Sequence, residues 1–145
     1  MNTYMKRAVE LAIQNVKEGG QPFGAVLEKD GKIIGEGVNE LHRVHDSSGH
    51  PELLAIRKAQ QELQTLDLSG ATMYASGHPC PMCYAVMRLA GIDQVYYYND
   101  LPELEAVGLR LGADIYKELK TERPEWPIHF ESLQEGIEDP LDSIK

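Results

Sequence analysis

The first forty residues change from a helical to an extended pattern of hydrophobic positions. Apolar side chains recur at helical spacing over residues 4–17, and the glycine pair at residues 19–20 is expected to end this helix. Residues 23–38 favour two strands joined at Asp30-Gly31, a dipeptide typical of two-residue hairpin turns. The chain is therefore predicted to begin with a helix followed by a β-hairpin.

The rest of the chain alternates between predicted helices and strands, after a polar loop over residues 39–49. Pro51 and Pro81 suit the first turns of two helices, where the N–H that proline lacks has no partner within the helix. The predicted helices are 51–63, 81–90, 102–109 and 113–120, and the predicted strands are 71–76, 94–98 and 126–132. This order predicts a three-layer α/β/α sandwich, with helices on both faces of a central five-stranded sheet.

Length and composition indicate how many domains the chain forms and which class of protein it belongs to. A chain of 145 residues with 42% hydrophobic and 26% charged residues is expected to form one domain, residues 1–145, with a core that needs no disulfide. Uncharged stretches are far shorter than the ~20 apolar residues of a membrane-spanning helix. No apolar signal-peptide segment follows Lys6-Arg7, so a cytoplasmic protein is expected.

The negative charge is concentrated in the last third of the sequence. The formal net charge is −9, and residues 93–145, with 5 basic and 13 acidic side chains, carry −8 of it. Such a field repels polyanions, which makes long nucleic-acid grooves unfavourable but leaves recognition of a single nucleotide open. The acidic segment over residues 131–142 is expected to be a solvated helix or a frayed end.

Four residues form a pattern typical of metal-assisted hydrolysis. His50 and Glu52 lie at the start of one predicted helix, and Cys80 and Cys83 lie at the start of another. The partial positive charge of a helix N-terminus favours thiolate, and two thiolates with one imidazole are good ligands for one zinc ion. Three protein ligands leave a position for water, from which Glu52 is placed to take a proton.

Two other interpretations of these residues remain open. The Cys80–Cys83 pair also suits a thioredoxin-like redox dithiol, and His78 would complete a closed, structural zinc site. A zinc finger with two cysteines and two histidines is excluded, because only His129 follows the cysteines. The combination of H-x-E, 26 further residues and P-C-x-x-C is more specific than either half alone.

This combination resembles the zinc-dependent cytidine/deoxycytidylate deaminase superfamily. The resemblance implies that His50, Cys80 and Cys83 bind one zinc ion per chain and that Glu52 is the catalytic proton shuttle. It also implies a five-stranded mixed sheet flanked by helices. The segments PFGAV (22–26), KDGKII (29–34), GEGVN (35–39) and IYKEL (115–119) look most similar to bacterial guanine deaminases.

The resemblance implies a substrate and two residues that bind it. The substrate would be a free nucleobase or a related amino-heterocycle, with guanine first and a role in purine metabolism. tRNA adenosine deaminases share GEG-x-N and remain an alternative, as do other nucleoside or cytosine deaminases. Asn39 matches the asparagine that contacts the base, and Phe23 matches an aromatic residue of the pocket. Without the resemblance, Asn39 would be a turn residue and Phe23 a core residue.

Three positions depart from the guanine deaminase pattern. Pro51 replaces the alanine of H-A-E and removes a backbone N–H, and His78 stands where relatives commonly have glutamate. Arg110 lies where guanine deaminases carry an acidic pair. These departures are expected to affect which ring is accepted.

A homodimer is also expected, since the family is commonly dimeric. Two predicted helices carry more apolar side chains than one sheet face needs, although packing within a single core would use the same residues. The residues concerned are Met82, Tyr84, Val86, Met87, Leu89, Leu104 and Leu109.

Overall fold

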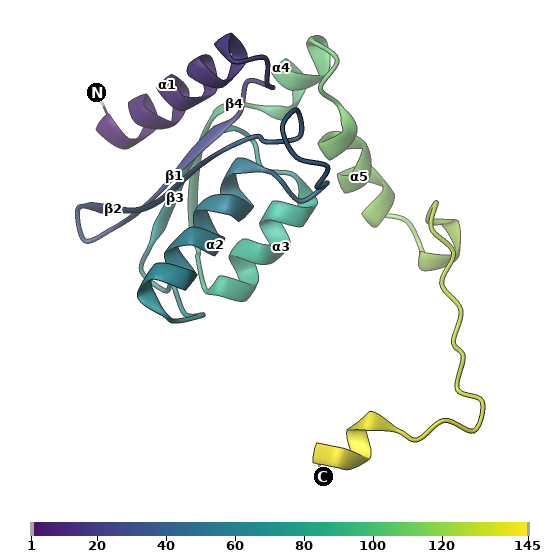
Figure 1. Cartoon of the computed structure of the whole chain (residues 1–145). Helices are drawn as coiled ribbons and strands as arrows, with labels where there is room; N and C mark the ends of the chain where they lie inside the picture. The colour runs from purple at the N-terminus through teal and green to yellow at the C-terminus, as the bar shows by residue number, and fades with distance from the viewer. Residues whose placement is uncertain (1, 145) are drawn as a thin grey trace.

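A four-stranded mixed sheet lies at the centre of the computed structural model, which describes residues 2–144 (Figure 1). Its strands are β1 (Gly24–Lys29), β2 (Lys32–Val38), β3 (Thr72–Gly77) and β4 (Gln94–Asn99), in the order β2-β1-β3-β4. β1 pairs antiparallel with β2 and β3, and β3 pairs parallel with β4. The predicted hairpin is confirmed: Asp30 and Gly31 both have positive φ, 52° and 80°, as a type I′ turn requires.

Helices cover both faces of this sheet, which confirms the three-layer α/β/α prediction. α1 (Thr3–Lys17) lies on one face, and α2 (Pro51–Leu63) and α3 (Pro81–Ala90) lie on the other (Figure 1). α4 (Leu101–Ala106) and α5 (Leu111–Leu119) follow β4, and α5 packs against α3 and α4. Short 3-10 helices occupy Arg123–Glu125 and Pro140–Ile144. Among the described residues, no helix has the length and apolar character needed to cross a bilayer.

The fifth strand, predicted at residues 126–132, is wrong. This segment has no strand structure, and Figure 1 shows the chain after α5 leaving the body of the molecule. Ile128 and Phe130 do alternate with polar residues, but their side chains are 72% and 62% exposed. Alternation indicates a two-faced segment and does not supply the neighbouring strand that must accept its hydrogen bonds. The acidic residues 131–142 are exposed, as expected, and only Pro140–Ile144 forms a short 3-10 turn there.

β1 is buried on both faces, because the sheet is covered on both sides. Ala25 and Leu27 belong to the larger core, between the sheet and the α2–α3 layer. Val26, between them in sequence, packs with Ala8 of α1 and Tyr74 of β3 in the smaller core on the other face. Successive side chains of a strand point to opposite faces, so a continuous apolar run is what a central strand requires.

Two glycines bring α2 against the backbone of β2. Gly35 and Gly37 lie two residues apart on β2, and so on one face of the strand. A Cβ atom at Gly35 would collide with the carbonyl oxygen of Ala55, and one at Gly37 would collide with that of Pro51. The absence of side chains at these two positions therefore sets the distance between the sheet and the first turn of α2.

We expect Gly37→Ala to destabilise the protein by about 1–3 kcal/mol, because the added methyl group must push the first turn of α2 away from β2. Urea unfolding followed by circular dichroism measures this change. Lys32→Ala, at the exposed start of the same strand, is the control and should have little effect. A Gly37→Ala protein as stable as the wild type would show that the contact between α2 and β2 is loose.

Candidate active site

The N-termini of α2 and α3 bring two side chains to one place. His50 is the N-cap residue of α2 and Cys80 is that of α3, and both have extended backbone conformations. A proline follows each of them at the first helical position, and a residue that precedes proline favours this conformation. Neither side chain caps its own helix. The imidazole and the thiol are therefore free to bind something else.

The ligand atoms of His50, Cys80 and Cys83 form a compact cluster. His50 Nδ1 lies 3.5 Å from Cys80 Sγ and 3.8 Å from Cys83 Sγ, and all three ligand atoms lie within 4.8 Å of one another. Zn–N and Zn–S bonds of about 2.0–2.3 Å in a tetrahedral arrangement require ligand atoms to be separated by distances of this order. Both cysteines are free thiols. The donor set therefore fits zinc and leaves a fourth coordination position open.

Hydrogen bonding between the two thiols makes Cys80 more acidic and Cys83 less acidic. The pKa of Cys80 is lowered, first by hydrogen bonding to Cys83 and also by the neighbouring His50 imidazole. The pKa of Cys83 is raised, because it is the partner in that bond and is buried. The pKa of His50 is raised by its hydrogen bond to Cys80. One thiolate therefore forms readily, and the second must lose its proton when a metal binds.

Glu52 lies in the first turn of α2 and is almost completely buried, with only 4% of its surface exposed. Burial raises the pKa of its carboxyl to about 7, although hydrogen bonding to Cys83 opposes this shift. The metal-ligand cluster does not include its carboxylate. A carboxyl group with this pKa both accepts and donates a proton near neutral pH, which is the property that general acid–base catalysis requires.

A cavity of about 280 Å³ opens next to these residues. His50, Glu52 and Cys80 lie on its wall. Much of the remaining wall is apolar and is formed by Leu41, Leu101, Leu104, Leu109 and Leu111. An apolar cavity with a few polar groups at one end is typical of a small-molecule site.

Both predicted substrate-binding residues line this cavity. Asn39 follows β2 and is 2% exposed, and its Oδ1 accepts a hydrogen bond from the Leu41 N–H at 3.1 Å. Phe23 precedes β1 and is half-buried, and its ring lies where a Cβ atom at Gly77 would be. The two side chains therefore border the cavity from the start of β1 and the end of β2.

The three departures from the guanine deaminase pattern also line the cavity, in different ways. Pro51 occupies the first position of α2, where a backbone N–H would have no partner within the helix. The His78 Nδ1 lies 2.9 Å from the Pro79 carbonyl oxygen, and His78 is not part of the metal-ligand cluster. Arg110, the residue before α5, is paired with Asp114 of that helix at 3.3 Å and is largely exposed. The positive charge of Arg110 thus lies next to a carboxylate of opposite sign.

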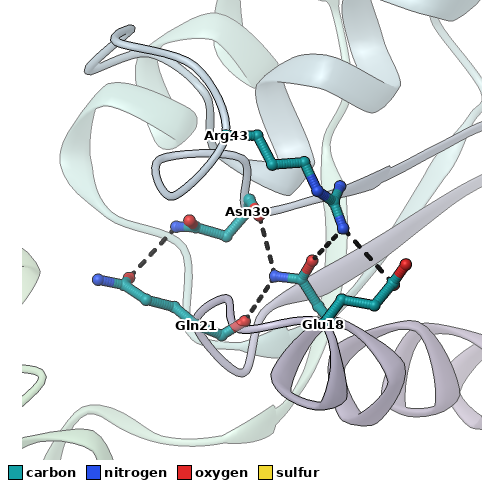
Figure 2. A network of polar contacts seen from close by, with 5 residues as sticks. Glu18, Gln21, Asn39 and Arg43 are labelled. Carbon is teal, nitrogen blue, oxygen red and sulfur yellow. Dashed lines mark hydrogen bonds and ion pairs between the residues drawn. The ribbon is translucent and has the colours of Figure 1, made fainter.

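A buried asparagine that the sequence analysis did not identify supports this wall. Asn15 of α1 is fully buried, and its Nδ2 donates to the carbonyl oxygens of Gln21 at 2.8 Å and Asn39 at 2.9 Å. Figure 2 shows Gln21 and Asn39 facing each other, with Arg43 and Glu18 on the far side of this network. One sequence signal for the burial of Asn15 was its position three residues after Ala12, within the apolar stripe of the first helix.

The sequence also indicated no role for Tyr116 of α5, although this residue lies in the IYKEL segment. Its hydroxyl donates to the Pro79 carbonyl oxygen at 2.6 Å, and burial, followed by the nearby Cys80, raises its pKa to about 12. The bond connects α5 to the turn that precedes Cys80. Tyr116 thereby helps to fix the start of α3.

Comparisons with known proteins agree on one family. Residues 1–99 match the model described as the cytidine and deoxycytidylate deaminase zinc-binding region. The chain is 40% identical over 129 residues to the guanine deaminase of Bacillus subtilis, an alignment that covers 88% of this chain and 82% of that protein. The crystal structure of guanine deaminase from Bacillus subtilis superposes with a TM-score of 0.86, covering 94% of this chain and 88% of that one.

Similarity to other members of the family is more limited. The tRNA-specific adenosine deaminase of Bacillus subtilis is 37% identical over 94 residues, which cover 65% of this chain and 58% of that protein. A structure determined in complex with 2,6-diaminopurine superposes with a TM-score of 0.69 at 29% identity, covering 72% of this chain and 59% of that one.

We expect the purified protein to contain about one zinc ion per chain, and His50→Ala and Cys80→Ala to lose it, because two remaining ligands hold the ion poorly. Inductively coupled plasma mass spectrometry measures the content. His45→Ala, in the exposed loop before α2, is the matched control and should keep its zinc. A metal-free wild type whose thiols react at once would instead favour a redox dithiol.

Proposed function

The chain belongs to the cytidine and deoxycytidylate deaminase family, and we propose that it hydrolyses the exocyclic amino group of a free nucleobase or a related amino-heterocycle. The observation that carries this proposal is the arrangement of the site. Three zinc-ligand side chains and the buried Glu52 carboxyl meet at one end of an apolar cavity of about 280 Å³. Such a cavity suits one small ring system.

The zinc ligands and Glu52 have separate roles in the proposed reaction. His50, Cys80 and Cys83 would hold the zinc ion, which would supply a Lewis acid that makes water a stronger nucleophile near neutral pH. Glu52 accepts the proton of the attacking water on its carboxylate and returns it to the departing nitrogen. The oxygen of water forms a bond to the ring carbon, the carbon–nitrogen bond breaks, and ammonia leaves. The oxo-substituted ring is the other product.

Two further residues are placed to orient the ring. The Asn39 amide both donates and accepts hydrogen bonds and suits the mixed polar edge of a nucleobase. The Phe23 ring supplies a flat apolar surface at the cavity wall, against which an aromatic ring can pack. These interactions hold the reacting carbon in position next to Glu52.

Guanine is the first candidate substrate. The chain is 40% identical to the Bacillus subtilis guanine deaminase over 88% of its length, whereas a tRNA adenine deaminase of Arabidopsis thaliana that matches a similar share, 87%, is only 31% identical. The net charge of −8 over residues 93–145 also opposes a tRNA backbone. Arg110, a cation among the cavity residues, lies beside the Asp114 carboxylate, which weakens its attraction for a phosphate. A tRNA adenosine deaminase is therefore the weaker alternative.

A cytoplasmic location agrees with the chemistry of the site. Cys80 and Cys83 must both be reduced to bind zinc, and the reducing conditions of the cytoplasm maintain free thiols.

A homodimer is supported by apolar side chains that this copy leaves uncovered. Met87 and Leu104, two of the residues expected at an interface, are instead buried in this chain. Tyr84 and Leu89 of α3 are 59% and 85% exposed. β4 forms one edge of the sheet, and the extended segment with Ile128 and Phe130 adds further exposed apolar surface. A second copy would cover such surface.

We expect the zinc-loaded wild type to release ammonia from guanine or a related ring, and Glu52→Ala to lose at least about 100-fold in kcat while keeping its zinc. An ammonia-release assay across free bases, nucleosides, nucleotides, pterins and triazines measures both proteins. Glu62→Ala, at the exposed end of the same helix, should be as active as the wild type.

Turnover by Glu52→Ala equal to the wild type would contradict the mechanism. Efficient turnover of a tRNA anticodon stem-loop, with free bases inert, would favour the alternative substrate.

We expect light scattering to give a mass near twice 16.2 kDa at micromolar concentration, because the exposed apolar residues are buried when two copies associate. Leu89→Glu should shift the population towards the monomer, whereas Leu66→Glu, after α2, should not. A single species of 16.2 kDa in the wild type would rule the dimer out.

A further inference from the structure

Two amide side chains meet at the wall of the cavity. Gln21 lies in the turn between α1 and β1, Asn39 follows β2, and both line the cavity. Asn39 Nδ2 donates to Gln21 Oε1 at 3.3 Å, and Figure 2 shows the two amide groups facing each other. Gln21 is largely exposed, whereas Asn39 is buried. Gln21 therefore extends the polar wall from Asn39 towards the mouth of the cavity.

A backbone N–H determines the orientation of both amides. The Leu41 N–H can only donate, so the atom that it contacts at 3.1 Å must be the oxygen of Asn39. The Asn39 nitrogen therefore faces Gln21. Because this nitrogen donates, the Gln21 atom that accepts the hydrogen bond must be the side-chain oxygen. This leaves the Gln21 Nε2 group without a hydrogen-bond partner among residues 2–144. The pair thus adds free N–H donors to the cavity wall.

The same buried residue fixes both members of the pair. Asn15 donates one hydrogen bond to the main chain of Gln21 and one to that of Asn39. Its Oδ1 lies 3.5 Å from an Arg43 nitrogen, and this nitrogen is also 3.5 Å from a Glu18 carboxylate oxygen. The distance between the Gln21 and Asn39 backbones is therefore fixed by a side chain in the core.

No carboxylate other than that of Glu52 accompanies this pair on the described part of the cavity wall. A ring edge that carries a carbonyl oxygen or an unprotonated nitrogen would accept hydrogen bonds from the amide N–H groups. An amino group on that edge would instead point its own N–H bonds at the Gln21 N–H group, so that two donors would face each other and neither would gain a hydrogen bond.

We propose that Gln21 is a specificity-determining residue whose free Nε2 group donates to an acceptor on the ring edge away from the reacting amine. The preferred substrates are then oxo-substituted amino-heterocycles rather than the corresponding diamino rings. This inference rests on the proposed deaminase function and deepens it, since it assigns the chemical class of the ring.

The test uses ring pairs that differ by one exchange of a carbonyl for an amino group: guanine with 2,6-diaminopurine, and cytosine with 2,4-diaminopyrimidine. The ring pair that the zinc-loaded wild type turns over faster is chosen. Steady-state kinetics then give kcat/KM for both rings of this pair, with the wild type, Gln21→Glu and Gln21→Leu. Glutamate keeps an oxygen for Asn39 but replaces the free donor by an acceptor. Gln61→Glu, at an exposed position of α2, is the control for the added charge.

The wild type should prefer the oxo member, and Gln21→Glu should reduce this preference at least about tenfold, mainly through a higher KM for the oxo ring, with zinc content unchanged. Gln21→Leu should lower kcat/KM for the oxo ring without a gain for the diamino ring. Gln61→Glu should behave as the wild type does.

Failure of this inference and failure of the proposed function give different results. An active wild type that prefers the diamino member, or a preference that neither Gln21 variant changes, would overturn the role of Gln21 and leave the deaminase proposal intact. A zinc-loaded wild type that releases ammonia from no ring would overturn the proposed function, and the specificity with it.

Discussion

The close contact between α2 and β2 is the constraint on which the site depends. Gly35 and Gly37 leave no side chain between the strand and the helix, so the first turn of α2 lies directly on the backbone of the sheet. That turn begins with His50 as its N-cap residue and contains Glu52. The positions of the His50 imidazole and of the Glu52 carboxyl group thus depend on the absence of two side chains from a neighbouring strand.

The second helix of the site is fixed from a different direction. Cys80 follows a strand end, and the carbonyl oxygen before it is held by the hydroxyl of Tyr116. The cluster of ligand atoms is therefore assembled from two rigid helix starts instead of from mobile loops. Rigid support of this kind keeps reactive groups within the small errors that catalysis tolerates.

Most helices and strands were predictable from sequence, because their signals are local. Pro51 and Pro81 mark helix starts, and Asp30-Gly31 marks a hairpin turn, whatever the rest of the chain does. The predicted strand at residues 126–132 failed because a strand also needs a neighbour. The pattern of H-x-E and P-C-x-x-C indicated which residues would meet. The burial of Asn15 had a signal in the helical pattern, but its two hydrogen bonds were not predictable, because residues 15, 21 and 39 come together only when α1 packs on the sheet.

The donor groups of the site come from distant parts of the chain, and this has a thermodynamic consequence. His50 and Cys80 are separated by 30 residues, a segment that includes α2 and β3. An ion bound by both joins the two ends of this segment as a cross-link, and it binds the unfolded chain far less well. The melting temperature of the protein is therefore not a constant of its sequence. It rises with the free zinc concentration of the surroundings.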